Sequence, residues 1–231
     1  MEISIVVPLY NEEESLSELK TRIDEALGSE FSYEIIFVDD GSTDDTWEKL
    51  LSIRDDRLCI FQNAEKLGVG ASLNLLLAKA TNEVIARMDA DDICFPWRFK
   101  SQKKEWLRSD VDFLFGNTVR FGVFWVFPEW AVRLSNEEIF DILPFYNPVS
   151  HPTLMAKKEA ILGLGGFPNG RGQDYALWLR AALSNHRFLK MRNYVLLYRN
   201  HKAQISRSST TNRNLAIDDL RRQLLINRRG V

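Results

Sequence analysis

Short runs of apolar residues alternate with helical patterns along the first ninety residues of the chain. Four runs are rich in β-branched or aromatic side chains and predict buried strands at residues 3–7, 33–38, 58–61 and 83–88. Between them, helical spacing of apolar side chains marks residues 16–27, a segment with Trp47, Leu50 and Leu51, and residues 71–80. This alternation predicts an α/β fold, with a mostly parallel sheet and helices on both faces.

The second half of the chain has a less regular pattern. A helix is expected after residue 92, running through Trp106, and residues 194–198 predict a last strand. Residues 113–127 are dense in aromatic side chains, which favours core strands; an acceptor platform or a membrane contact is the alternative. Residues 163–172 contain five glycines and predict a mobile lid over a site.

The composition is that of an ordinary globular protein. With 231 residues, the chain fits one α/β domain or one domain with a small appendage. A net charge of −2 gives no reason to expect nucleic acid as a partner. Two cysteines without a disulfide framework suit a reducing compartment. No uncharged apolar run approaches the roughly 20 residues of a membrane span. The chain starts on a strand pattern, so we expect no signal peptide and a cytoplasmic location.

Charge is uneven along the chain. Residues 199–231 contain eight Lys or Arg and two Asp or Glu, a local charge of +6, so the remainder carries −8 to give the net −2. Within this segment, residues 214–231 can form an amphipathic helix with Ile217, Leu220, Leu224 and Leu225 on one side. We expect a basic C-terminal helix that is solvated or packed within the protein; weak peripheral attachment to an anionic membrane is the alternative hypothesis.

Three carboxylates follow the predicted strand at residues 83–88. Asp89, Asp91 and Asp92 would repel one another unless a cation lies among them, and hard oxygen ligands select Mg²⁺ or Mn²⁺. An EF-hand loop is excluded, because Ile93 and Cys94 occupy the positions where it needs Asp or Asn and Gly. The alternative is a turn whose Asp side chains cap the helix that follows.

A second acidic turn follows the strand at residues 33–38. Ser42 and Asp45 resemble a capping arrangement for the next helix, which leaves Asp39 and Asp40 unexplained. Ligands of open α/β sheets bind outside the carboxyl ends of strands, where a carboxylate can accept a hydrogen bond from a base or ribose. Glycines 68 and 70 at a helix start lack the third glycine of a dinucleotide fingerprint, but they can let backbone N–H groups approach a phosphate.

Three further polar residues lie in the second half. Asp174 precedes a helix whose apolar face carries Tyr175 and Trp178, and its alternative role is an N-cap. His151 lies beside proline, and we expect it to be structural. His201 follows the last predicted strand and is either a surface residue or a ligand.

Six stretches, taken in order, resemble the family 2 glycosyltransferases of the GT-A fold, which use nucleotide-sugar donors. They are Pro8 to Glu12, Val38 to Ser42, Gly68 to Asn74, Asp89 to Asp92, Gln173 to Asp174 with Tyr175 and Trp178, and Tyr198 to His201. The resemblance covers residues 3 to about 206. It implies a Rossmann-like sheet in one domain, residues 1–206, with a nucleotide-sugar-binding half at 1–110 and an acceptor and catalytic half at 111–206. Residues 207–231 would be the basic C-terminal helix or tail.

The resemblance also implies roles for particular residues. Asp174 would be the catalytic base, Asp91 and His201 would bind the metal, and Asp40 would contact the base, usually uracil. The other donor contacts would be Pro8, Tyr10, Glu12, Gly68, Asn74 and Asp89, the last lying by the ribose or the metal. The family usually has Glu-Asp where this chain has Gln173-Asp174, and Arg-Asn where it has Leu73-Asn74.

The implied reaction is transfer of a sugar, with inversion, from a UDP-sugar or another nucleotide-sugar to a hydroxyl of a glycan or glycolipid. Mn²⁺ or Mg²⁺ would neutralise charge on the departing diphosphate, and an Asp base would take the proton of the acceptor. Acceptor determinants are expected between residues 116 and 172. Surface polysaccharide biosynthesis is the process that the family suggests.

Three rival functions remain open. A polyprenyl-phosphate sugar transferase shares the early motifs, but its phosphate acceptor needs little help from a base such as Asp174. A nucleotidyltransferase would need a glycine-rich basic loop after the first strand, and residues 9–14 contain none. A catalytically degenerate nucleotide-sugar-binding module is disfavoured by Asp91, Asp174 and His201 together.

Overall fold

The computed structural model describes residues 1–122, 125–128, 130–200 and 214–229. Along the chain its elements are β1 Glu2–Leu9, α1 Leu16–Leu27, β2 Ser32–Asp39, α2 Thr46–Ser52, β3 Leu58–Gln62, α3 Val69–Lys79, β4 Val84–Arg87, β5 Ile93–Cys94, α4 Arg98–Trp106, β6 Phe113–Gly122, β7 Trp125–Pro128, α5 Asn136–Ile142, the 3₁₀ turn η1 His151–Thr153, β8 Met155–Lys157, α6 Lys158–Gly163, α7 Gln173–Leu183, β9 Phe188–Arg199 and α8 Leu215–Arg229.

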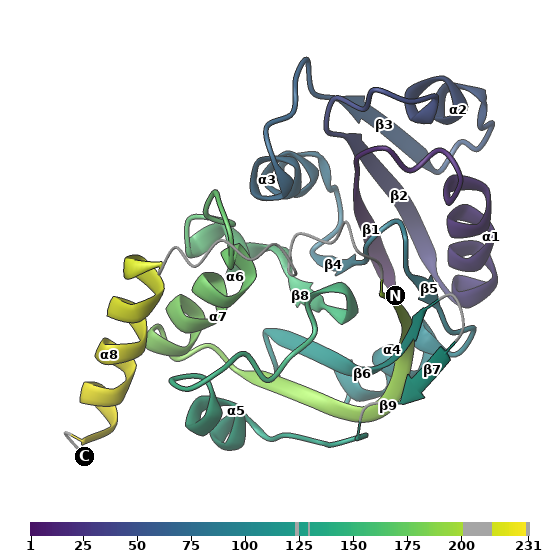
Figure 1. The fold of residues 1–231 in the computed structure, drawn as a ribbon. Helices are drawn as coiled ribbons and strands as arrows, with labels where there is room; N and C mark the ends of the chain where they lie inside the picture. Colours follow the sequence, from purple (N-terminus) through teal and green to yellow (C-terminus); the bar gives the residue numbers. More distant parts are fainter. Residues whose placement is uncertain (123–124, 129, 201–213, 230–231) are drawn as a thin grey trace.

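One sheet runs through the described part of the chain in the order β3-β2-β1-β4-β8-β6-β9-β5, with β7 paired to β6 (Figure 1). The strands from β3 to β4 pair in parallel, as the strand-helix alternation predicted. Beyond β4 the pairing is mixed, since β8 is antiparallel to β4 and β6 while β9 is parallel to β6. The predicted α/β architecture is confirmed. Because β4 pairs with β8, the sheet continues across the two proposed halves, and their boundary stays a prediction.

The two faces of β1 explain why helices cover both sides of the sheet. Ile5 and Val7 point into one core cluster, which includes Leu19 and Ile23 of α1. Val6 points into the other cluster, which includes Leu73, Leu76 and Leu77 of α3. Successive strand side chains alternate between faces, so a run that is apolar at every position must be covered on both sides. The C-terminal ends of β1, β2 and β4 consequently lie together at one edge.

The aromatic segment at residues 113–127 divides into a buried part and an exposed part. Phe113 and Phe115 of β6 are fully buried and pack edge-on against Trp178 of α7. The prediction of core strands is wrong for β7, where Val126 is 67% and Phe127 61% exposed. Among the described strands, β7 pairs with β6 alone, and neither Val126 nor Phe127 belongs to a core cluster.

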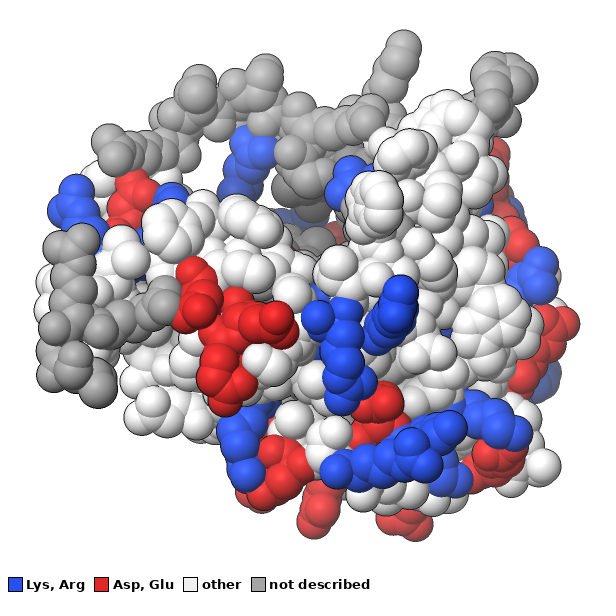
Figure 2. Space-filling model, turned by 90° about the horizontal axis from the view of Figure 1, so that it is seen from below, with Lys and Arg blue, Asp and Glu red and all other residues white. Residues whose placement is uncertain are grey.

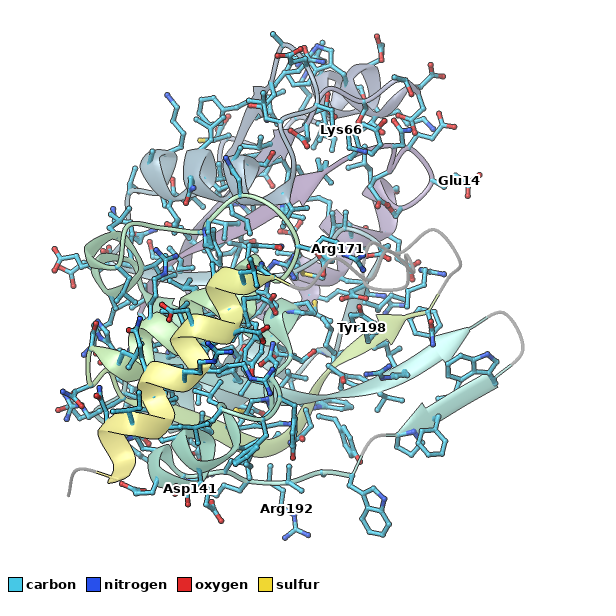
Figure 3. All side chains as sticks on the ribbon, turned by 60° about the vertical axis from the view of Figure 1, so that its left-hand side comes forward. Glu14, Lys66, Asp141, Arg171, Arg192 and Tyr198 are labelled. Carbon is cyan, nitrogen blue, oxygen red and sulfur yellow. The ribbon has the colours of Figure 1, made fainter. Side chains whose placement is uncertain are left out.

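The C-terminal helix α8 packs along α7 (Figures 1 and 3). Ile217 and Leu224, from its predicted apolar side, belong to the same core cluster as Trp178, while Leu215 and Ile226 are exposed. This is the packing within the protein that we expected as one outcome of the amphipathic pattern. Membrane attachment through α8 stays a prediction, and it would have to use the exposed side. No helix among the described residues is both long and apolar enough to cross a membrane.

Charged side chains of both signs lie close together on the face seen from below in Figure 2. This view shows no broad field of one sign, in keeping with the net charge of −2. A face of this kind offers little electrostatic attraction to a polyanion.

We predict that Leu224→Ala destabilises the protein by about 2–3 kcal/mol, because it removes a buried side chain and leaves a cavity. Leu215→Ala, on the same helix but at a position 75% exposed, is the matched control and should change stability by less than about 0.5 kcal/mol. Denaturant unfolding of both variants measures this. Equal stability of the two would contradict the packing of α8 as described.

Candidate functional site

The acidic loop after β4 gathers three carboxylates. Asp89, Asp91 and Asp92 can each place one oxygen within 4.8 Å of the others. Asp92 is buried; its Oδ1 accepts a hydrogen bond from the backbone N–H of Arg199 at 2.8 Å, whereas its Oδ2 has no hydrogen-bond partner among the described residues. Burial and the charges of Asp89 and Asp91 raise the pKa of Asp92 well above its ordinary value. An oxygen-only donor set with an unpartnered buried carboxylate oxygen fits a hard divalent cation.

The alternative role of these residues as helix caps is not observed. Helix α4 begins after Trp97, and no side chain caps its first turn. The capping arrangement expected at Ser42 and Asp45 is wrong too, because Asp45 makes no side-chain cap and the Ser42 hydroxyl donates to Asp39 instead. In the second turn the neighbouring Asp44 has this role instead, since its Oδ1 accepts a hydrogen bond from the backbone N–H of Thr46, the first residue of α2, at 3.1 Å.

Arg87, at the end of β4, was missed by sequence reasoning. It is buried, and its two terminal nitrogens donate to the two oxygens of Asp89, with Nη1 at 2.7 Å from Oδ2. The guanidinium therefore neutralises Asp89. The available signal was a single arginine inside an otherwise apolar strand.

Glu12 belongs to the same acidic site. Its backbone N–H donates to Thr46 Oγ1 at 2.8 Å, which holds the connection after β1 against α2. The Ser15 hydroxyl donates to the Glu12 carboxylate at 2.6 Å. Burial, against which the Ser15 bond acts, together with the negative charges of Asp91 and Asp89 raises the pKa of Glu12 to about 7. Glu12 thus couples the first strand end to the acidic loop.

Asp40 organises the loop before α3. Its buried carboxylate accepts hydrogen bonds from Asn63 Nδ2 at 2.7 Å, from Leu67 N at 3.0 Å and from Gly68 N at 2.8 Å. The backbone N–H of Gly68, which we expected to approach a phosphate, is therefore already hydrogen-bonded within the protein. Contact between Asp40 and a nucleotide base stays a prediction. Beyond this loop, the Lys66 ammonium lies 3.4 Å from the ring centre of Tyr10, the aromatic side chain predicted to line the nucleotide pocket beside Pro8.

Asn74 joins α3 to the glycine-rich segment. Its side chain accepts from Phe167 N and donates to Phe167 O, both at 2.8 Å. Gly166 has a positive φ of 73° and approaches Asn74 so closely that a Cβ would collide with the amide oxygen. Because this bonding holds the middle of residues 163–172 on α3, the segment is anchored where we expected a mobile lid. A role of Asn74 in donor binding stays a prediction.

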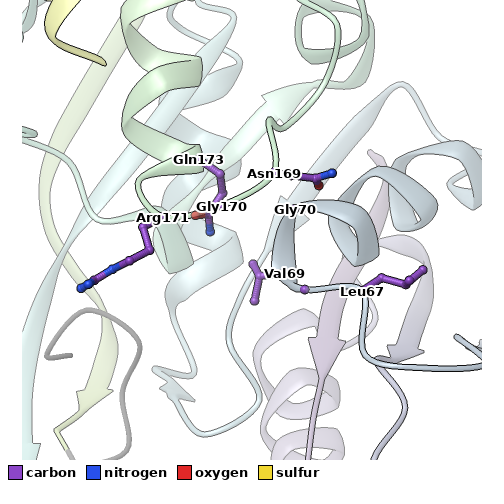
Figure 4. A pocket seen from close by; sticks show the side chains of 8 residues that line it. Leu67, Val69, Gly70, Asn169, Gly170, Arg171 and Gln173 are labelled. Atoms are coloured by element: carbon purple, nitrogen blue, oxygen red, sulfur yellow. The ribbon is translucent and has the colours of Figure 1, made fainter. Parts of the chain in front are cut away.

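A pocket of about 210 Å³ lies where this segment meets the start of α3 (Figure 4). Leu67 to Gly70 line one side, and Asn169 to Arg171 with Gln173 line the other. Gly70 packs closely against the segment, since a Cβ there would lie 2.6 Å from Pro168 O. Arg171 projects from the loop that precedes α7 (Figure 3). The pocket therefore lies between the loop that precedes α3 and the start of α7, the helix that carries Asp174.

Asp174 lies in the first turn of α7. The N-cap of α7 is Gly172, so the alternative role of Asp174 as an N-cap is wrong. Asp174 Oδ2 accepts a hydrogen bond from Asn147 Nδ2 at 3.0 Å. Burial raises the pKa of Asp174, against the opposing effects of backbone N–H groups, Arg87 and Asn147. A partly buried carboxylate with a raised pKa can accept a proton near neutral pH.

His151 and His201, the two histidines singled out in the sequence, differ. His151 is buried against Phe167 and Trp178, and burial lowers the pKa of its imidazole well below the ordinary value, as expected for a structural residue. His201 lies outside the described residues. The described end of β9 does reach the acidic loop, since Arg199 Nε donates to Asp91 O at 2.8 Å.

Comparisons with known proteins agree on one family. The sequence model described as Glycosyl transferase family 2 matches residues 4–162. The O-antigen biosynthesis glycosyltransferase WbnJ of Escherichia coli is 31% identical over 197 residues, which cover 81% of this chain and 76% of that protein.

Two solved structures show the fold. TarS 1-349 of S. aureus, in complex with UDP-GlcNAc, has a TM-score of 0.78 at 20% identity, covering 98% of this chain and 66% of that one. The mannosyltransferase PcManGT of Pyrobaculum calidifontis, in complex with GDP-Man and Mn²⁺, has a TM-score of 0.66 at 22% identity, covering 87% and 57%.

The raised pKa of Glu12 predicts a pH-dependent stability of the metal-free protein. Between pH 4.5, its ordinary pKa, and about 7, the folded state holds a proton that the unfolded state releases. The free energy of unfolding should therefore fall as pH rises through this window, by at most about 1.4 kcal/mol per pH unit for one proton. Glu12→Gln should flatten the profile of melting temperature against pH, measured with a chelator present. Exposed Glu14→Gln is the control. A profile equally steep in Glu12→Gln and wild type would contradict the prediction.

Proposed function

This chain belongs to glycosyl transferase family 2, and on that premise we propose that it transfers a sugar from a UDP-sugar to a hydroxyl of a glycan or glycolipid, inverting the anomeric centre. The observation that carries the proposal is the division of carboxylates between two places. Glu12, Asp91 and Asp92 lie together at the C-terminal edge of the strands. Asp174 lies on α7 and is hydrogen-bonded to Asn147 instead.

The strand edge would hold the donor. A bound Mn²⁺ or Mg²⁺ would neutralise charge on the leaving diphosphate. Asp91 is its proposed protein ligand, with His201 completing the shell, and Asp92 Oδ2 is the buried oxygen that a cation would satisfy. Arg87 keeps Asp89 neutralised and oriented toward the ribose or the metal. Pro8, Tyr10 and Asp40 would line the base, while Gly68 and Asn74 shape the adjoining pocket.

Asp174 would act on the acceptor. The acceptor oxygen forms a bond to the anomeric carbon, the bond from that carbon to the diphosphate oxygen breaks, and the hydroxyl proton passes to the Asp174 carboxylate. A pKa raised by burial makes this carboxylate a stronger base than an exposed aspartate. A single displacement of this kind inverts the anomeric centre.

The ligands and pathways of similar proteins support the choice of substrates. TarS was solved with UDP-GlcNAc, which favours a uridine nucleotide, and PcManGT with Mn²⁺, which favours a divalent metal. WbnJ acts in O-antigen biosynthesis, which favours assembly of a surface polysaccharide. We place the reaction at the cytoplasmic side of a membrane if the acceptor is a glycolipid. In the rival function, polyprenyl-phosphate sugar transfer, the phosphate acceptor would need little help from a base, so the partly buried Asp174 would have no comparable role.

Asp91→Asn should weaken metal-dependent donor binding at least tenfold, about 1.4 kcal/mol, because it removes charge from the proposed ligand. Calorimetric titration with UDP and Mn²⁺ measures the change. Asp56→Asn, an exposed aspartate on the loop before β3, is the control for loss of one negative charge. Undiminished binding by Asp91→Asn would remove Asp91 from the site.

Asp174→Asn should lower turnover by roughly 10²–10⁴, the usual contribution of a positioned base, while donor affinity stays within a few-fold. Transfer to a glycan acceptor and binding of UDP are measured on the same preparation. Asp141→Asn, at an exposed position of α5, is the control. Near-wild-type transfer by Asp174→Asn would refute its role as the base.

A further inference from the structure

We infer that Asn147 is a positioning residue for Asp174: its amide orients the carboxylate and sets the pH at which the base works. The inference rests on the proposed function, because it gives Asn147 a role through Asp174. Sequence reasoning assigned nothing to Asn147, which lies 27 residues before Asp174 on an irregular loop.

The amide of Asn147 is itself held in one orientation. Its Oδ1 accepts a hydrogen bond from Val149 N at 3.3 Å, so that its Nδ2 donor faces Asp174 Oδ2 at 3.0 Å. An N–H of the backbone can only donate, which fixes the oxygen of the amide toward Val149. The Asp174 carboxylate therefore faces the N–H donor of Asn147 and not its oxygen, and this bond constrains the orientation of the carboxylate.

The loop that carries Asn147 is supported from behind. The Tyr175 hydroxyl donates to Leu143 O, and Arg221 of α8 donates from Nε to Pro144 O at 2.5 Å and from Nη2 to Phe145 O at 2.9 Å. Tyr175 directly follows Asp174 on α7. The base and the loop that holds its partner are thus joined twice, once through Asn147 and once through Tyr175.

The charges around Asp174 decide what loss of Asn147 does. Arg87 of β4 lowers the pKa of Asp174, and so do the backbone N–H bonds at the start of α7 and the amide of Asn147. On α8, Asp218 and Arg221 face the neighbouring Tyr175 with opposite effects on its pKa, and Arg171 lies on the preceding loop. Without the Asn147 donor, burial acts against fewer stabilising groups, so the pKa of Asp174 rises. A base with a higher pKa is protonated, and inactive, up to a higher pH.

Asn147→Asp tests the inference, because it keeps an acceptor for Val149 N and replaces the donor to Asp174 by a second acceptor. The acidic limb of kcat against pH should move up by about one unit or more, since a hydrogen bond to a charged group changes an equilibrium by about tenfold or more. At a pH on this acidic limb kcat should fall about tenfold, with recovery at higher pH, and the KM for donor should stay within about twofold. Asn147→Ala should move the limb in the same direction.

Asn136→Asp is the matched control. Its side-chain oxygen also accepts a backbone N–H, that of Phe188 at 2.8 Å, but it lies on α5. It should leave the limb unmoved. An unmoved limb in Asn147→Asp, with or without a lower melting temperature, would overturn the positioning role while the loss of transfer in Asp174→Asn keeps the base in place. Full transfer by Asp174→Asn would instead refute the base itself, and no transfer by the wild-type protein would refute the proposed function.

Discussion

The buried guanidinium of Arg87 is the charge around which the site is arranged. A buried cation is costly unless its hydrogen bonds are met by anions, and here Asp89 meets both terminal nitrogens. Its positive charge also acts on Asp92 and Asp174, where it opposes the rise in pKa that burial causes, and on His151, where it adds to the lowering of the pKa by burial. Arg98, fully buried, donates to Arg87 O at 2.6 Å and Pro152 O at 2.9 Å, which ties the end of β4 to η1. The strand that presents the acidic loop is thus fixed on both sides.

The two halves of the sheet are joined near this charge by contacts that leave little freedom. Asn74 bonds the backbone of Phe167, and Arg180 of α7 donates to Leu164 O and Gly166 O at 2.8 and 2.7 Å. The glycine-rich segment is therefore hydrogen-bonded to α3 on one side and to α7, the helix of Asp174, on the other.

Helix α8 gives the C-terminal segment a structural role. Ile217 fills the space beside Gly172, where a Cβ would lie 2.7 Å from Ile217 Cδ1, and Arg221 supports the loop of Asn147. The same amphipathic pattern would suit a membrane surface or a protein surface. Here the surface of α7 covers its most apolar positions, Ile217 and Leu224.

The sequence by itself determined the order of strands and helices through β4, because their apolar periods are local and both faces of β1 must be covered. It also marked Asp91, which lies in a run of carboxylates at a strand end, and Asp174, through the resemblance of its surroundings to a family motif. Only the tertiary structure decided the partners: Asn147 meets Asp174 across 27 residues, and Asn74 meets Phe167 across 93. Arg87 could be read as a strand residue, but its pairing with Asp89 depends on how β4 ends. The period of apolar residues in a sequence shows which face of its own helix or strand a residue occupies. Its hydrogen-bond partners on distant elements depend on how the helices and strands pack together.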